Sequence, residues 1–392
     1  MLALEGIRIL DLSRAAPGPF CTMILSDLGA EVIKIEAPPG ASRLQAGAVS
    51  DGERRNIAYQ TLSRNKKSIG LNMRSEEARH IFYQLVEQAD VIIEGFRPGV
   101  VKRLGVDYET VSKINPKIVY GSVSSYGQDG PYRDLIAHDL NSIAMGGALD
   151  LIGEKGGRPV IPLNLLADFG GSAMCLAIGI LSALIARSKT GKGQYVDISM
   201  LDSVIGLLSS VAAGYFRDNI VPKRGDGTMT GAAPYYNIYE TKDEKRITIG
   251  NLEPWIWENF CREIGKEDFI PYQTDETKWE EVSTYFKQLF LTKTRDEWFE
   301  LLSRKNIFIG KVHSLDEVFT DSHVIHRQMV IEVEHPTEGK IKQVGIAVKL
   351  SDTPGEVRSL PPMLGEHTDE ILVGLGYDKQ RINELRQKGA IS

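Results

Sequence analysis

Residues 4–40 read LEGIRILDLSRAAPGPFCTMILSDLGAEVIKIEAPPG, and their pattern predicts the class of fold. The apolar run 7–12 is typical of a buried strand. The next segment opens with Pro17 and stops at Gly29, which are helix start and stop signals. A second apolar run follows at 32–35. A strand, a helix and a strand in this order indicate a unit of a parallel sheet.

The same alternation continues through the first half of the chain. Apolar residues at helical spacing predict a helix at 76–88, and short apolar runs predict strands at 91–93, 118–123 and 194–199. Helices between strands favour an α/β fold whose parallel sheet is covered on both faces, with ligands bound beyond the carboxyl ends of the strands. The first turn lacks the G-x-G-x-x-G fingerprint, which argues against NAD or FAD binding.

The second half of the chain changes in texture. The apolar stretch 170–186 falls just short of a membrane span and is interpreted as a helix buried in a globular core. A polar segment near 222–230 then precedes strand-like runs and tryptophan-rich helices. We therefore predict a large domain over 1–220, a small α+β domain over 221–330 and a C-terminal segment over 331–392.

Composition excludes several classes of protein. The net charge of −6 gives no sign of nucleic-acid binding. Three scattered cysteines, Cys21, Cys175 and Cys261, argue against a zinc site or a disulfide framework and favour a reducing compartment. The N-terminal apolar run is too short and too acidic for a secretory signal. We expect a cytoplasmic protein that binds neither nucleic acid nor membrane and holds no metal.

Basic residues gather near the predicted strand ends. Arg97 is the strongest candidate, because it stands between Phe96 and Pro98 directly after the strand at 91–93. Cations at the ligand edge of a sheet favour binding of an anion such as a phosphorylated nucleotide. The alternative for each is a solvated surface charge. The other members of the set are Arg43, Arg64, Lys66, Lys67 and Arg103.

Three further segments carry titratable side chains. His138 and Asp139 follow a glycine-rich turn, and an imidazole is the usual group for proton transfer at neutral pH. Asp168 precedes two glycines and an apolar helix, and Glu253 precedes Pro254. The alternatives are a histidine that packs and two acids that serve as helix caps.

Taken together, the segments resemble CoA-transferase family III, which includes the α-methylacyl-CoA racemases. The resemblance rests on the first 40 residues and on NKKSIGLNM, EGFRPGVVKRLG, YGQDGP, NLLADFGG, RSKTGKGQYVDISMLD, GAAPYYNIY and PPMLGEHTDEIL, in this order. It implies a Rossmann-like large domain completed by residues 331–392, a small inserted domain and an interlocked homodimer. It also implies an acyl-CoA thioester as substrate, with no cofactor beyond the coenzyme A that the substrate carries.

The resemblance further implies an active site. Racemases of the family pair the aspartate at Asp168 with a histidine in an H-D motif and a glutamate in an E-P motif, here His138 and Glu253. We expect His138 and Asp168 to serve opposite faces of the α-carbon, Glu253 to orient His138, and N–H groups from Asp168 to Gly170 to hold the enolate oxygen. The alternative is a CoA-transferase in which Asp168 is the nucleophile. A CoA-ester binder without activity is a third interpretation.

We assign coenzyme A binding to the basic set and to residues of the neighbouring motifs. The assigned residues are Arg43, Arg64, Lys67, Phe96, Arg97, Arg103, Tyr126, Gly127 and Asp139.

Overall fold

The structure is a computed structural model that describes residues 1–14, 16–38, 61–335 and 339–392. The chain forms two compact units. The first contains residues 1–146, 163–207 and 326–392, and the second contains residues 147–162 and 208–325.

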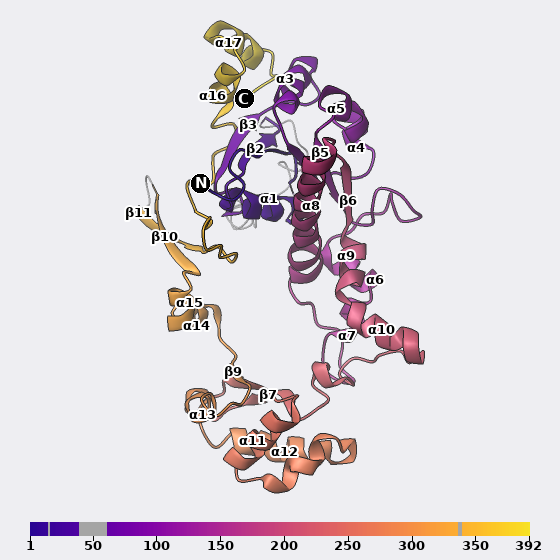
Figure 1. The fold of residues 1–392 in the computed structure, drawn as a ribbon, viewed down its shortest axis with the longest axis vertical. Coiled ribbons are helices and arrows are strands. Elements are labelled where there is room, and N and C mark those ends of the chain that lie inside the picture. The colour runs from indigo at the N-terminus through magenta and orange to yellow at the C-terminus, as the bar shows by residue number, and fades with distance from the viewer. Residues whose placement is uncertain (15, 39–60, 336–338) are drawn as a thin grey trace. The chain divides into compact units, whose positions relative to one another are not determined.

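A six-stranded, all-parallel sheet forms the centre of the first unit (Figure 1). The strand order β3-β2-β1-β4-β5-β6 reverses direction between β1 and β4, which is where open α/β sheets bind ligands. The α/β class expected from the sequence is therefore confirmed. The strands are β1 (Arg8–Asp11), β2 (Glu31–Glu36), β3 (Lys66–Gly70), β4 (Val91–Glu94), β5 (Val119–Ser124) and β6 (Tyr195–Ser199).

Helices cover both faces of this sheet because successive side chains of each strand point to opposite sides. Ile9 packs into one hydrophobic cluster with α1 (Pro17–Asp27) and α8 (Met174–Thr190). Leu10 packs into the other cluster with the helices of the opposite face. These are α3 (Glu76–Glu87), α5 (Tyr108–Ile114), α16 (Thr368–Gly374) and α17 (Lys379–Gln387), while α4 (Val100–Leu104) lies at its margin.

C-terminal residues cover the β3 edge of the sheet. The Ser392 N–H donates to the Gly70 carbonyl at 3.2 Å, and the His367 N–H donates to the Ser68 carbonyl at 2.9 Å. Ile391 is buried beside Leu71. An edge strand covered in this way has no free backbone with which to pair with another chain. The same C-terminal part carries a two-stranded hairpin, β10 (Val330–His335) with β11 (Gly339–Val344).

The apolar stretch predicted as a helix buried in a globular core has only one covered face. A π-helix, η2 (Leu165–Ala173), runs directly into α8, and the two together form a stretch of 26 residues. Its most apolar window has a mean hydropathy of 2.0, and 39% of that window is buried. Its length and composition alone would allow it to cross a membrane. Ile180 and Leu176 pack under the sheet, whereas Ile178 and Ile185 are exposed. The shorter neighbours are α6 (Asp139–Met145) and α9 (Met200–Leu207).

The second unit encloses an aromatic core against a three-stranded antiparallel sheet. The strands are β7 (Tyr236–Glu240), β8 (Arg246–Gly250) and β9 (Ile309–Lys311), in that order. Trp257, Phe260, Phe286 and Phe290 are all fully buried, and their rings meet in edge-to-face and stacked contacts. The helices of this unit are α7 (Ala148–Leu151), α10 (Ser209–Asp218), α11 (Pro254–Glu263), α12 (Trp279–Phe290), α13 (Arg295–Leu302), α14 (Leu315–Val318) and most of α15 (Ser322–His326).

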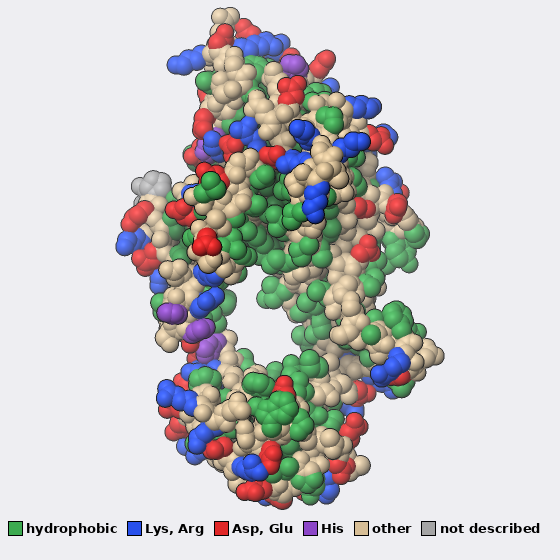
Figure 2. Space-filling model, in the orientation of Figure 1, with side chains coloured by type: hydrophobic (Ala, Val, Ile, Leu, Met, Phe, Trp, Pro, Cys, Tyr) green, Lys and Arg blue, Asp and Glu red, His purple; other side chains and the backbone are tan. Residues whose placement is uncertain are grey.

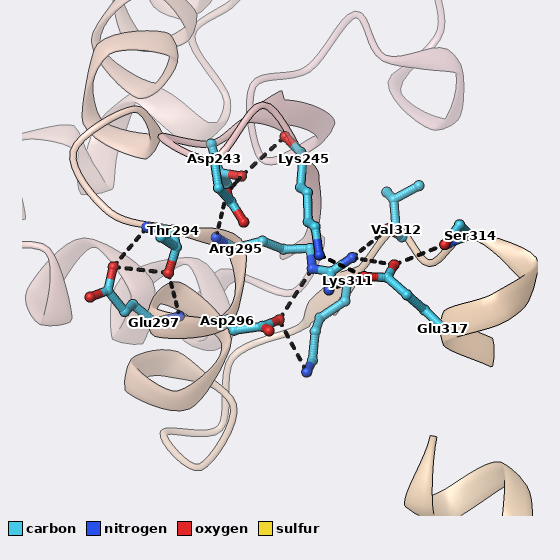
Figure 3. A network of polar contacts seen from close by, with 12 residues as sticks. Asp243, Lys245, Thr294, Arg295, Asp296, Glu297, Lys311, Val312, Ser314 and Glu317 are labelled. Atoms are coloured by element: carbon cyan, nitrogen blue, oxygen red, sulfur yellow. Dashed lines mark hydrogen bonds and ion pairs between the residues drawn. The ribbon is translucent and has the colours of Figure 1, made fainter. Parts of the chain in front are cut away.

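A buried arginine network closes this core (Figure 3). Arg295 donates to both carboxylate oxygens of Glu317, at 2.7 and 2.9 Å, and to the Val312 carbonyl at 3.0 Å. Lys245 also binds Glu317, at 2.7 Å. These donors hold the pKa of Glu317 well below its usual range. The network therefore joins α13, α14 and the turn before β8.

The unit boundaries differ from those predicted. Residues 147–162 and 208–220 group with the second unit, whose expected range was 221–330. Arg224 accounts for part of this difference, because it donates to the Asp150 carbonyl at 2.7 Å and to the Gly157 carbonyl at 2.8 Å. Composition marks only the polar segment near 222–230 and gives no sign of this pairing.

Candidate active site and nucleotide-binding edge

Asp139 connects α6 to the candidate aspartate. Its Oδ2 accepts the backbone N–H groups of Ala167 and Asp168, at 2.7 and 2.8 Å. Asp139 is 4% exposed, and its Oδ1 is buried without a hydrogen-bond partner among the described residues. Asp139 was predicted to contact coenzyme A; its Oδ2 is occupied by backbone of the same unit, and the contact itself stays a prediction.

His138 lies at the N-terminus of α6, one residue before this link. It occupies the N-cap position with an extended backbone, and its N–H donates to the Asn141 side chain at 3.1 Å. The side chain of His138 is exposed. Its charge lowers the pKa of Asp168, so the two groups are close enough to interact. The structure thus brings together two of the three predicted catalytic residues.

Asp168 occupies an unusual backbone position. It lies within η2 rather than before a helix, so the interpretation as a simple N-cap is wrong. The Asn164 side chain donates to its Oδ2 at 3.0 Å. Burial raises the pKa of Asp168, and the negative charge of Asp139 adds to this effect. The Asp168 N–H is bonded to Asp139, which removes it from the N–H groups expected to hold an enolate oxygen.

Glu253 belongs to the second unit, at the N-cap of α11. Its side chain makes no capping bond, and its Oε2 is buried without a partner among the described residues. A plain helix cap would accept an N–H of the first turn. Glu253 therefore makes no hydrogen-bonded cap, while its place at the start of the helix agrees with the alternative interpretation as an acid favoured by the helix dipole.

The loop after β4 carries the strongest of the predicted nucleotide-binding residues. Phe96 donates its N–H to the buried Glu94 carboxylate at 2.7 Å, and the Arg14 guanidinium lies 5.4 Å from the centre of its ring. Arg97 and Arg103 are exposed. All of these residues lie beyond the carboxyl end of the sheet, near the point where the strand order reverses.

Arg133 joins this basic group, although the sequence reading did not select it. A side chain built at Gly99 would come within 3.7 Å of the Arg133 guanidinium and 3.8 Å of the Arg103 guanidinium, so the two cations flank this glycine. Arg133 also donates to the Gln128 carbonyl at 2.9 Å. Its position in GPYRD, after the predicted glycine turn, was the available signal.

The loop after β5 holds Tyr126 and Gly127. The Tyr126 hydroxyl lies 3.1 Å from the Met145 sulfur, and its ring meets Tyr132 at 5.8 Å. Gly127 has a φ of +90°, which an L side chain rarely adopts. Its N–H donates to the Ser124 hydroxyl at 3.0 Å. The two residues therefore lie in a tight turn at the same edge of the sheet.

Glu94 is buried below both loops. Its carboxylate also accepts the Ser122 hydroxyl, and Ser122 in turn accepts the Gln128 side chain at 2.8 Å. Burial raises the pKa of Glu94 to about 7, with a smaller contribution from Asp197. This network was not predictable from the sequence, because Glu94 has the pattern of a polar residue at the end of an apolar strand.

Two other predicted ligands lie at the opposite end of the sheet. Arg64 and Lys67 lie at the amino end of β3, not at the ligand edge. Arg64 is 4% exposed and forms an ion pair with Asp27 at 2.6 Å, whereas Lys67 pairs with Glu370 at 2.8 Å. Their predicted contact with coenzyme A is therefore wrong. Arg43 lies outside the described residues.

The second unit contains an open cleft of about 1450 Å³ over its sheet. Ile238 and Phe308 supply exposed apolar surface, and the cations of Arg158, Arg246 and Lys287 lie around it. Separately, no group of three His, Cys, Asp or Glu side chains that could hold a metal ion occurs among the described residues.

Comparison with known proteins identifies the family. Residues 4–368 match CoA-transferase family III. The sequence is 32% identical to human alpha-methylacyl-CoA racemase, over 98% of this chain and 96% of the relative. It is 34% identical to mouse succinyl-CoA:glutarate CoA-transferase, over 100% of this chain and 91% of the relative.

The fold agrees with this result. A CAIB/BAIF family protein from Brucella suis superimposes with a TM-score of 0.80 at 28% identity, covering 95% of this chain and 99% of that one. The six-stranded parallel sheet with its covering helices is shared with solved members of this family of enzymes. The chain belongs to CoA-transferase family III. Its relatives include both racemases and transferases.

Proposed function

We propose that this protein is a racemase that exchanges the α-proton of a 2-methylacyl-CoA thioester. The observation that carries the proposal is the link from His138 through Asp139 to Asp168. Because Asp139 directly follows His138 and bonds the N–H of Asp168, one short hydrogen-bonded unit holds both acid/base candidates. Two such groups are what inversion at the α-carbon requires, one on each face.

The proposed reaction moves one proton off the carbon and another onto it. In one direction His138 removes the α-proton, the C–H electrons pass into the enolate, and protonated Asp168 delivers a proton to the opposite face. The reverse direction uses the same groups in exchanged roles. The raised pKa of Asp168 supports this role, because it increases the fraction of the carboxyl that carries a proton near neutral pH.

Glu253 is the third residue of the proposed catalytic set. A carboxylate that accepts one ring N–H fixes the tautomer in which the other nitrogen can act as a base. The unpartnered Oε2 of Glu253 supports this assignment. The nucleotide part of the substrate would bind at the ligand edge of the sheet, through Phe96, Arg97, Arg103, Arg133, Tyr126 and Gly127.

A CoA-transferase is the second candidate. Its supporting observation is that Asp168 is only half-buried and that its Oδ1 has no hydrogen bond to a described residue, as a nucleophile requires. In this mechanism the carboxylate attacks the thioester, CoA leaves as a thiolate, and an acyl anhydride forms on Asp168. The CoA thiolate attacks the aspartyl carbonyl of this anhydride, which releases the donor acid and leaves an aspartyl thioester. The acceptor carboxylate attacks this thioester and expels CoA again, and attack of CoA on the acceptor carbonyl of the new anhydride gives the acceptor CoA ester and frees Asp168. His138 would have no proton to transfer.

The experiment that separates the two is proton NMR of the purified protein with one enantiomer of a 2-methylacyl-CoA in deuterated water, without any acceptor acid. Loss of the α-proton signal together with racemisation supports the proposal. We expect His138→Ala to reduce this exchange by on the order of 100-fold or more. His80→Ala, which removes an exposed histidine from α3, is the matched control. Absence of exchange, with CoA transferred to an added acid, would establish the transferase.

We further propose that the protein is cytoplasmic and forms a homodimer. Exposed apolar side chains gather around α8 and α9 (Figure 2), and Ile178, Ile185 and Leu207 are each at least half exposed. A surface of this kind favours a protein partner. The proposal of a cytoplasmic protein is supported by the three free cysteines, because free thiols persist in a reducing compartment. Light scattering after size exclusion should give twice the chain mass, and Ile178→Asp should lower it; a wild-type monomer would contradict the dimer.

A further inference from the structure

Burial of the Asp139 carboxylate costs free energy, and a purely structural role does not explain why the protein buries a charge at this position. It is nearly fully buried, yet only its Oδ2 is hydrogen-bonded, and both bonds come from neutral backbone N–H groups. Its Oδ1 has no partner among the described residues. Burial of a charged oxygen without a partner is unfavourable. An asparagine amide oxygen could accept the same two N–H groups without the burial of a charge.

The two N–H groups belong to the first turn of η2, the π-helix that carries Asp168. An N–H at the start of a helix has no partner within the helix, so an acceptor from another element must fix it. Asp139 provides this acceptor from α6. The direction of the Asp168 side chain depends on the backbone that these bonds hold.

The electrostatic surroundings of Asp168 give Asp139 a second effect. η2 packs against α1, α6, α8 and α9. Within this group of elements the charge of Asp139 raises the pKa of Asp168, and that of His138 lowers it. The other titratable groups that these elements carry are Cys21 and Asp27 of α1, Cys175, Arg187 and Lys189 of α8, and Asp202 of α9.

We propose that Asp139 is a positioning residue for Asp168: its Oδ2 fixes the backbone at Asp168, and its negative charge acts directly on the Asp168 carboxyl. The inference rests on the proposed function, because it assigns the charge a use only if Asp168 transfers a proton. Asp139 touches no reacting atom in this scheme. This use of the negative charge accounts for an aspartate, and not an asparagine, directly after His138.

The test compares Asp139→Asn with Asp139→Ala. Asparagine can keep both backbone bonds but removes the charge. We expect the Asp139→Asn protein to remain folded, the carboxyl of Asp168 to titrate at lower pH, and the acidic limb of the pH–rate profile to move in the same direction. Asp139→Ala also loses the two bonds, and we expect kcat to fall on the order of 10- to 100-fold with a smaller change in KM.

Carbon-13 NMR of labelled aspartate carboxyls, assigned with Asp168→Asn, follows the titration without relying on activity. Ser142→Ala, which removes a buried hydroxyl one turn further along α6, is the matched control and should leave the titration unchanged. An Asp168 carboxyl that titrates identically in wild type and Asp139→Asn would overturn the inference. A wild-type protein that exchanges no α-proton would instead overturn the proposed function, so the two failures are distinguishable.

Discussion

Replacement of Glu94 by glutamine should stabilise the protein in alkaline solution but not in acid. Glu94 is 1% exposed, and its two oxygens accept the Phe96 N–H and the Ser122 hydroxyl. A glutamine can place its oxygen on the Phe96 N–H and its amide on Ser122 as a donor, because a hydroxyl also accepts. The substitution therefore removes the charge, keeps the bond from the Phe96 N–H and reverses the direction of the bond with Ser122.

The magnitude follows from the pKa of Glu94, which burial raises from 4.5 to about 7. A raised carboxyl pKa means that the folded state binds the proton more tightly than the unfolded state. The resulting stability is fully present below about pH 4.5 and is lost as the pH rises to about 7. This difference corresponds to about 3 kcal/mol at about 1.36 kcal/mol per pH unit. Glutamine stays neutral, so Glu94→Gln should exceed wild type by up to this amount at pH 8.

Urea unfolding followed by far-UV circular dichroism at pH 5, 6.5 and 8 measures the effect. Tryptophan fluorescence is an internal control, because all four tryptophans lie within residues 255–298 of the second unit. Glu87→Gln, at an exposed position on α3, is the matched variant and should change little at any pH. A stability difference between Glu94→Gln and wild type that is equal at pH 5 and pH 8 would refute the reasoning.

Three further substitutions test other parts of the structure. Arg64→Met should lower the free energy of unfolding by about 3–5 kcal/mol, because it leaves the buried Asp27 carboxylate without its partner; a loss below about 1 kcal/mol in urea unfolding would contradict the ion pair. Ile391→Ala should lower the free energy of unfolding by about 2–4 kcal/mol, because it opens a cavity beside β3. Urea unfolding measures this change as well, and an unchanged stability would mean that this end of the chain is not packed. Glu317→Gln should destabilise the second unit at neutral pH, because ionised Glu317 binds Arg295. The pKa of Glu317 is lowered in the folded state, so the difference in stability between Glu317→Gln and wild type should shrink as the pH falls below about 4.5. Unfolding followed by tryptophan fluorescence measures this difference, and a value that does not change with pH would contradict the reasoning.

The apolar strands and amphipathic helices were predictable because burial leaves a direct pattern in the sequence. The helix predicted at 76–88 is observed as Glu76–Glu87, and the strand predicted at 118–123 is observed as Val119–Ser124. β3 was missed because its sequence, KKSIG, begins with two lysines. Lys66 is nevertheless fully buried, where it pairs with Asp11 at 3.3 Å. Only the tertiary structure supplies such a partner.

The candidate site shows the same limit. The motifs selected His138 and Asp168, but the link between them depends on the Asp139 carboxylate, which was assigned from the sequence to coenzyme A binding. The π-helix around Asp168 was unpredictable from spacing, because a single wide turn leaves no periodic signal. Arg64 was assigned to the ligand edge because a basic run does not show which end of a strand it occupies.

The cover over the β3 edge also has a consequence for protein synthesis. Strand β3 is complete once residue 70 has been made, but the residues that close its open edge lie at 359–392. During translation the outer edge of β3 therefore stays unpaired while about three hundred further residues are synthesised. The contiguous part of the second unit, 208–325, leaves the ribosome earlier than this closing segment. The first unit therefore starts to be synthesised before the second unit but is completed after it. Its unpaired β3 edge is the surface that a nascent-chain chaperone would have to shield.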